Sequence, residues 1–98
     1  EQVLGCIALK VIEPGHGEIK SMRTDAAFRR RGVAQRLMDH LLAEANARGL
    51  VRLSLETGSL PSFFPAHRLY ERYGFTDCGP FADYREDPYS RYMTRQIG

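Results

Sequence analysis

The apolar residues of this chain change their spacing from that of strands to that of helices and back. The chain begins with an almost continuous apolar run over Val3–Ile12, which predicts a first strand with both faces buried. A Pro-Gly pair then predicts a turn. Glu18–Thr24 alternates imperfectly, with Ile19 and Met22 as its main apolar members. This segment predicts a second strand with a local bulge.

The spacing becomes helical after Gly32. Successive steps of four, one, three, one and three residues place one set of side chains on a single helical face: Val33, Leu37, Met38, Leu41, Leu42 and Ala45. Gly49 ends this helix. Leu50–Thr57 then alternates strictly, with one apolar and one polar face. A helix between two strands predicts a parallel β–α–β crossover.

The last third of the chain predicts a shorter helix and two further strands. After a break at Gly58–Pro61, a stripe of residues predicts a helix that ends at Gly74: Ala66, Leu69, Tyr70 and Tyr73. Phe75–Cys78 predicts a short strand and Tyr92–Ile97 a final one. No repeat or linker interrupts the pattern. Residues 1–98 therefore predict a single domain of the α/β class with a mixed sheet.

Composition limits what this domain is expected to bind. The chain has 98 residues and a net charge of only +2, which favours a discrete anionic ligand over nucleic acid. No apolar run is long enough to span a membrane, so no membrane partner is expected. Cys6 and Cys78 are expected to be reduced thiols, and the histidines show no zinc-binding spacing. These features predict a cytoplasmic protein with no bound metal.

The segment Arg29–Ala34 carries the strongest chemical signal. It reads Arg-x-x-Gly-x-Ala and stands between a predicted strand and the start of the long helix. Gly32 permits a close backbone approach, and the first amides of a helix lack partners inside it. Three arginines add forked, charge-assisted donors, so the segment predicts a pyrophosphate site. Taken without this context, three arginines are equally well a solvated turn. The sequence has neither a Walker P-loop nor a dinucleotide fingerprint.

Two ordered motifs resemble the GNAT superfamily of N-acetyltransferases. The first is Arg29–Ala34, and the second is the Leu-Tyr-x-x-x-Gly-Phe run at Leu69–Phe75, with the strand segment Leu53–Gly58 between them. The resemblance covers nearly the whole chain. It implies a GNAT-like fold and acetyl-CoA as the cosubstrate. The family's N-terminal strand and helix pair have no counterpart in this sequence, so a truncated, partial GNAT domain is expected.

The resemblance also implies roles for individual residues. The strand whose backbone pairs with the pantetheine arm and the acetyl group is matched by Met22, Arg23 and Thr24. The pyrophosphate loop is matched by Arg29, Arg30, Arg31, Gly32, Val33 and Ala34. Tyr70 matches the tyrosine near the thioester sulfur that serves as the general acid, whereas helical spacing alone favours a core position. Where the family often has Asn before its second helix, this chain has Thr57 and Gly58.

An amine that attacks a thioester must first lose a proton, since alkylammonium groups have a pKa near 10.4. The candidate bases are Glu18 and Glu56. Glu56 is favoured because it lies near the carboxyl end of its strand, where parallel sheets bind ligands. Either glutamate is otherwise a solvated strand residue. Phe63 and Phe64 are packing residues or line an apolar acceptor pocket. The acidic loop around Asp83 is solvated surface or attracts a cationic amine.

Two functions of different classes fit these observations. The first is an enzyme that transfers the acetyl group of acetyl-CoA directly to a primary amine of a small molecule or peptide. The alternative is a non-catalytic coenzyme A-binding module or assembly subunit with a degenerate acetyltransferase fold. A nucleic-acid-binding domain is less favoured because aromatic and basic residues are not interleaved. Since the first strand needs cover on both faces, a homodimer or a longer native protein is also expected.

Overall fold

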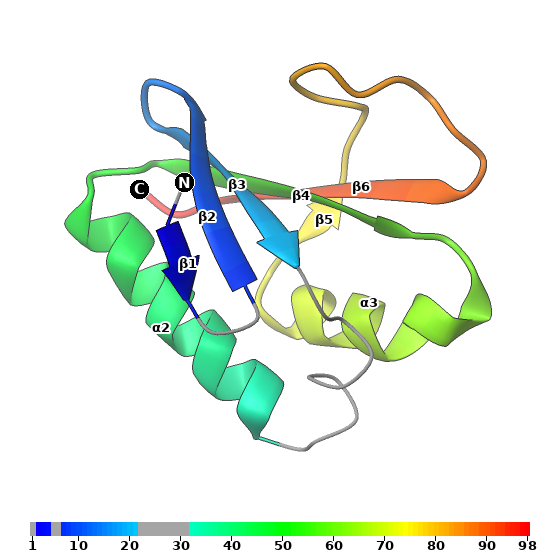
Figure 1. The fold of residues 1–98 in the computed structure, drawn as a ribbon, viewed down its shortest axis with the longest axis horizontal. Coiled ribbons are helices and arrows are strands. Elements are labelled where there is room, and N and C mark those ends of the chain that lie inside the picture. The colour runs from blue at the N-terminus through cyan, green and yellow to red at the C-terminus, as the bar shows by residue number, and fades with distance from the viewer. Residues whose placement is uncertain (1, 5–6, 22–31) are drawn as a thin grey trace.

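Strands form one sheet, and two helices pack against one of its faces (Figure 1). The computed structural model describes residues 2–4, 7–21 and 32–98, and the elements below lie within them. In the first half these are β1 (Gln2–Leu4), β2 (Ile7–Glu13), β3 (His16–Ser21) and the long helix α2 (Val33–Ala47). In the second half they are β4 (Arg52–Gly58), the single turn η1 (Pro61–Phe63), α3 (Phe64–Arg72), β5 (Thr76–Asp77) and β6 (Ser90–Gln96).

The order of the strands across the sheet is β1-β2-β3-β4-β6-β5. The strands β3 and β4 are parallel, and all other neighbours are antiparallel. The helix α2 lies between β3 and β4 in the chain, so the predicted parallel β–α–β crossover is confirmed. The mixed α/β sheet that the sequence predicts is confirmed as well.

The prediction of a single first strand over Val3–Ile12 is wrong. The run contains two strands, β1 and β2, which pair antiparallel with Val3 opposite Ala8. Hydrophobicity alone does not separate one long apolar strand from two short ones. The sequence signal for a break is Gly5, because glycine weakens a strand interior. In β2 Ala8 and Leu9 are fully buried, whereas Val11 is 49% exposed.

The second predicted strand is confirmed as β3 over its first half, and it begins two residues earlier than expected. Gly15 has φ +78° in the turn between β2 and β3, a conformation that side chains with a Cβ rarely adopt. The irregularity in this pair lies in β2, where the register shifts between Val11 and Glu13. The remainder of the predicted strand, from Met22 on, lies outside the described residues.

The apolar core lies between the sheet and the helices. It contains residues of α2 and α3 together with strand residues that point to the same side: Leu9, Ile19, Ala34, Met38, Leu41, Ala45, Leu53, Leu55, Ala66, Leu69, Tyr70 and Met93 among others. Helical spacing selects the core members of both helices, and strand alternation selects those of β4. Tyr73 at the end of α3 joins the two helices, since its hydroxyl donates to Asp39 Oδ1 over 2.8 Å.

The opposite face of the sheet is covered by the segment between β5 and β6, residues 78–89, which we call the covering loop (Figure 1). Aromatic rings hold it in place: Phe81 and Tyr84 meet edge to face at 5.1 Å, and Tyr84 and Tyr92 are 5.6 Å apart. The hydroxyl of Tyr92 also donates to the carbonyl of Arg85 over 2.6 Å. The sheet therefore has a helix-covered face and a loop-covered face.

Candidate active site

The parallel strands β3 and β4 separate at their carboxyl ends. Within the described residues their register runs from His16 opposite Arg52 to Ile19 opposite Leu55 and then ends. Both strands continue, β3 to Ser21 and β4 to Gly58. Among the described residues, the backbone of β4 beyond Leu55 is therefore not paired with β3. Such an opening between parallel strands is a site where ligands are expected.

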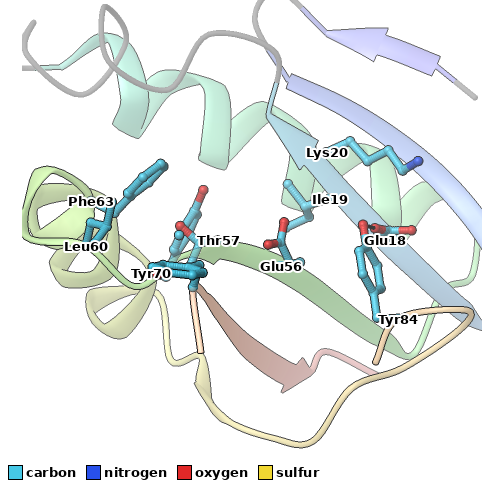
Figure 2. Close-up of a pocket in the computed structure, with 11 residues that line it drawn as sticks. Glu18, Ile19, Lys20, Glu56, Thr57, Leu60, Phe63, Tyr70 and Tyr84 are labelled. Atoms are coloured by element: carbon cyan, nitrogen blue, oxygen red, sulfur yellow. Dashed lines mark hydrogen bonds between the residues drawn. The ribbon is translucent and has the colours of Figure 1, made fainter. Parts of the chain in front are cut away.

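A pocket of about 600 Å³ occupies this opening. Its wall is built by β3, β4, η1, α3 and the covering loop, from Glu18, Ile19, Lys20, Glu56, Thr57, Gly58, Leu60, Phe63, Tyr70, Tyr84 and Tyr89. The volume is in the range of small-molecule and cofactor sites. Figure 2 shows Tyr70 and Thr57 towards one end of the pocket, Glu18 and Tyr84 towards the other, and Glu56 between them.

Tyr70 forms the wall of the pocket on the helix-covered face. It lies on the buried stripe of α3 and is 2% exposed, with its ring 6.1 Å from that of Phe75. Burial disfavours the phenolate and raises the pKa of Tyr70 to about 12. The hydroxyl is protonated at neutral pH, as an exposed tyrosine also is, and is available as a proton donor.

Glu56 forms the wall on the loop-covered face. Strand alternation points it away from Leu55 and the helices, and it is half-buried. One of its carboxylate oxygens accepts a hydrogen bond of 2.7 Å from Ser90 Oγ, which lies on the neighbouring strand β6. This contact orients the carboxylate and leaves its other oxygen for a ligand.

Glu18 lies on the same face as Glu56 and is 3% exposed. The hydroxyl of Tyr84 donates to Glu18 Oε2 over 2.6 Å, which ties the covering loop to β3. Burial and this hydrogen bond raise the pKa of Tyr84 above its usual value. The side chain of Lys20 runs away from Glu56 (Figure 2). The inner wall of the pocket is therefore acidic.

The mouth of the pocket near η1 is apolar. Leu60 is 51% exposed and Tyr89 is 69% exposed, and their segments are joined because Ser59 N donates to the carbonyl of Tyr89 over 3.0 Å. The ring of Phe63 packs onto Gly58, where an added Cβ would overlap the ring. Glycine at this position is required for that close approach.

The start of α2 has the geometry expected of an anion site. Gly32 is the N-cap residue with φ +88°, and no side chain caps the helix there. Among the described residues beyond its chain neighbours, a Cβ added to Gly32 meets nothing within 4 Å. The helix dipole also favours negative charge at this end. Figure 1 shows this helix start and the beginning of α3 on the same side of the sheet.

The predicted site residues fall into three groups. Tyr70 and Glu56, together with the second candidate base Glu18, are brought to one pocket, and Phe63 lines it as well. Gly32, Val33 and Ala34 lie at the start of α2. The other predicted cosubstrate contacts lie outside the described residues: Met22, Arg23, Thr24, Arg29, Arg30 and Arg31.

Sequence reasoning did not assign Tyr84 or Ser90 a place in the site, and it left the contact at Thr57 open. Tyr84 and Glu18 are 66 positions apart, and Ser90 and Glu56 are 34 apart. Hydrophobic periodicity carries no information on such distant pairs. The one available signal was the concentration of tyrosines in the covering loop.

The second candidate pocket residue, Phe64, is 46% exposed and lies against His67 with a ring distance of 5.8 Å. Cys78 is a free, half-buried thiol, and burial raises its pKa.

None of the described helices is long and apolar enough to cross a membrane. Among the described residues, no group of three or more histidine, cysteine or acidic side chains is placed to hold a metal ion.

Comparisons with known proteins give one consistent result. The sequence profile of the acetyltransferase (GNAT) family matches residues 1–75. The uncharacterized N-acetyltransferase YsnE of Bacillus subtilis is 55% identical over 97 residues, covering 99% of this chain and 64% of that protein. The uncharacterized N-acetyltransferase YedL of Escherichia coli is 52% identical over 94 residues, covering 96% of this chain and 59% of that protein.

A solved structure from Klebsiella pneumoniae, assigned as an acyl-CoA N-acyltransferase, has the same fold. It superposes with a TM-score of 0.83 at 34% identity, covering 96% of this chain and 63% of that one. The fold is that of the acyl-CoA N-acyltransferases. This chain belongs to the acetyltransferase (GNAT) family. It spans less than two thirds of the length of each of these relatives.

Proposed function

We propose that this protein transfers the acetyl group of acetyl-CoA to a primary amine of a small molecule or peptide, by direct attack of the amine on the thioester. The observation that carries the proposal is the pocket between β3 and β4, with Tyr70 on one side and Glu56 on the other. A general acid and a general base on opposite walls suit a reaction in which the acceptor loses a proton and the leaving group gains one. Family membership supports the same chemistry.

In this proposal the acceptor amine enters on the loop-covered face, and Glu56 removes its proton, directly or through a water molecule. The two glutamates make this wall attractive to an ammonium group. The free amine then attacks the carbonyl carbon of the thioester. The nitrogen of the resulting tetrahedral adduct then loses a second proton, to Glu56 after it has passed the first to solvent, or to water. The oxyanion is stabilised by a backbone N–H of the parted strands and collapses to the amide with release of the thiolate.

Tyr70 is proposed to protonate the departing thiolate. Its hydroxyl is protonated at neutral pH, as that of any tyrosine with a pKa of 10 or above is, and burial raises its pKa further, to about 12. Coenzyme A is proposed to lie with its pyrophosphate at the segment Arg29–Ala34, where Gly32 begins α2. We further propose that residues 1–98 act as one domain of a cytoplasmic protein that forms a homodimer, which sedimentation velocity tests.

The proposal is tested by following thiol release from acetyl-CoA with a panel of primary amines. We expect turnover with at least one amine, and we expect Glu56→Gln to lower kcat by about 10²–10⁴-fold because it removes the base. The matched control is Glu44→Gln on α2, outside the pocket, where Glu44 pairs with Arg48. Binding of coenzyme A without any turnover would favour the non-catalytic module instead.

A further inference from the structure

The hydroxyl oxygen of Thr57 is buried among the described residues and has no hydrogen-bond partner. Thr57 is 5% exposed and lines the pocket between β3 and β4. Folded proteins leave very few buried polar groups unpaired, because an unpaired group loses its hydration without compensation. A missing partner at a pocket wall indicates that a ligand atom completes the bond.

A second threonine of the same sheet shows how such a hydroxyl is normally satisfied. Thr94 on β6 accepts from Arg52 Nη1 over 2.9 Å and lies 2.9 Å from Ser54 Oγ. It also lies 3.1 Å from the carbonyl of Leu53, to which it is able to donate. Thr94 does not line the pocket, and its bonds are complete within the protein. Thr57 differs in both respects.

The position of Thr57 limits which ligand atom it meets. Thr57 follows Glu56 in β4, and strand alternation points the two side chains to opposite faces of the sheet. Glu56 is on the loop-covered face, where the amine is proposed to enter. Thr57 points to the helix-covered face, where Tyr70 lies (Figure 2). It therefore faces the acyl donor rather than the acceptor.

This inference rests on the proposed function, which fixes the order of the reacting atoms. The carbonyl carbon must lie between the amine at Glu56 and the sulfur that Tyr70 protonates. In this interval the acyl thioester has two atoms that accept hydrogen bonds, the sulfur and the thioester carbonyl oxygen. Because Tyr70 is assigned to the sulfur, the carbonyl oxygen is left for Thr57. We propose that Thr57 Oγ1 donates a hydrogen bond to the carbonyl oxygen of the bound acyl thioester.

Thr57 keeps its own proton throughout the reaction and forms no covalent bond. Its hydrogen bond becomes stronger as the carbonyl oxygen gains negative charge, so it acts together with the backbone donor of the oxyanion. The unsatisfied hydroxyl of the free protein is thus a donor oriented before the substrate arrives. Such orientation avoids reorganisation at the moment of reaction.

The test compares Thr57→Val with Thr57→Ser in the full-length protein. Valine keeps the shape of threonine and removes the hydroxyl, whereas serine keeps the hydroxyl. Calorimetry measures the affinities for coenzyme A, which has no carbonyl at the thiol end, and for acetyl-CoA. We expect Thr57→Val to weaken acetyl-CoA binding about three- to tenfold while coenzyme A binds as in the wild type. We also expect kcat to fall about tenfold or more, with Thr57→Ser retaining both properties.

Thr94→Val is the matched control, because it makes the same chemical change outside the pocket. It removes satisfied hydrogen bonds, so we expect a lower Tm and an unchanged ratio of the two affinities. Thr57→Val removes an unsatisfied hydroxyl, so its Tm without ligand is expected to equal or exceed that of the wild type.

The inference is overturned if Thr57→Val keeps the wild-type affinity ratio and kcat in a protein that binds and uses acetyl-CoA. A wild-type protein that binds neither coenzyme A nor acetyl-CoA would overturn the proposed function as well. If Thr57→Val does not fold, Thr57→Ala takes its place, and the same ratio decides.

Discussion

At the scale of single residues, the site combines groups whose environments suit opposite tasks. Tyr70 is buried among apolar neighbours and holds its proton, whereas Glu56 is half-buried and oriented by Ser90. Differences of this kind between neighbouring titratable groups separate an acid from a base. The two residues belong to different elements and opposite faces of the sheet, and the opening between β3 and β4 is what brings them to one pocket.

Replacement of Tyr70 by Phe tests its role as the acid. The change removes only the hydroxyl, so the fold and the affinity for coenzyme A are expected to change little. We expect kcat to fall about 10²–10⁴-fold. Steady-state kinetics with the best amine measures this, and Tyr73→Phe, whose hydroxyl contacts Asp39 outside the pocket, is the control. An unchanged kcat in Tyr70→Phe would mean that Tyr70 is a core residue only.

At the scale of elements, the two ends of α2 offer a controlled comparison. Gly32 at its start has φ +88° and Gly49 beyond its end has φ +73°. In the part of the chain that the structure describes, and chain neighbours apart, an added Cβ at either glycine meets no atom within 4 Å. Valine at either position costs at least about 1–2 kcal/mol of backbone strain. We expect Gly32→Val to lose coenzyme A binding, because it also obstructs the proposed pyrophosphate site, and Gly49→Val to retain it.

Urea unfolding measures the strain in both variants, and calorimetry measures coenzyme A binding. The wild-type affinity should fall with added salt, since the site is built for phosphate charges. Equal affinities in the wild type, Gly32→Val and Gly49→Val would contradict the assignment of this helix start.

The sequence predicts best those elements in which apolar residues recur with a clear helical or strand period. The helix over α2 and the strand β4 follow directly from the positions of Met38, Leu41, Leu53 and their neighbours. The boundary between β1 and β2 was missed because an apolar run has no period that marks a reversal. Tyr70 was found only through its motif, since its helical spacing alone indicates the core, where it also lies.

The remainder of the site depends on contacts between distant segments. Tyr84 reaches Glu18 only because aromatic packing folds the covering loop onto the sheet. That the hydroxyl of Thr57 lacks a hydrogen-bond partner among the described residues follows only from the three-dimensional packing around the pocket. Local sequence patterns describe which face a residue occupies. They do not describe which partner it finds there.

At the scale of the whole molecule, burial of Tyr70 makes stability depend on pH in the alkaline range. The pKa of Tyr70 is raised to about 12 in the folded protein, whereas an unfolded tyrosine has a pKa of about 10. Below pH 10 the phenol of Tyr70 holds its proton in both the folded and the unfolded state, so its full contribution to the free energy of unfolding is present. As the pH rises from 10 towards 12, the unfolded chain loses the proton first, so the free energy of unfolding falls.

We therefore expect the stability of the wild type to decline more steeply than that of Tyr70→Phe between pH 9 and pH 11. A difference of two pKa units corresponds to about 2–3 kcal/mol once the upper limit is reached. Urea unfolding at several pH values measures both proteins, and the other alkaline titrations cancel in the comparison. Tyr89→Phe, with a ring that is 69% exposed in the wild type, should follow the wild-type curve. Parallel curves for the wild type and Tyr70→Phe would show that the phenol is hydrated in the folded protein, and the raised pKa of Tyr70 would be contradicted.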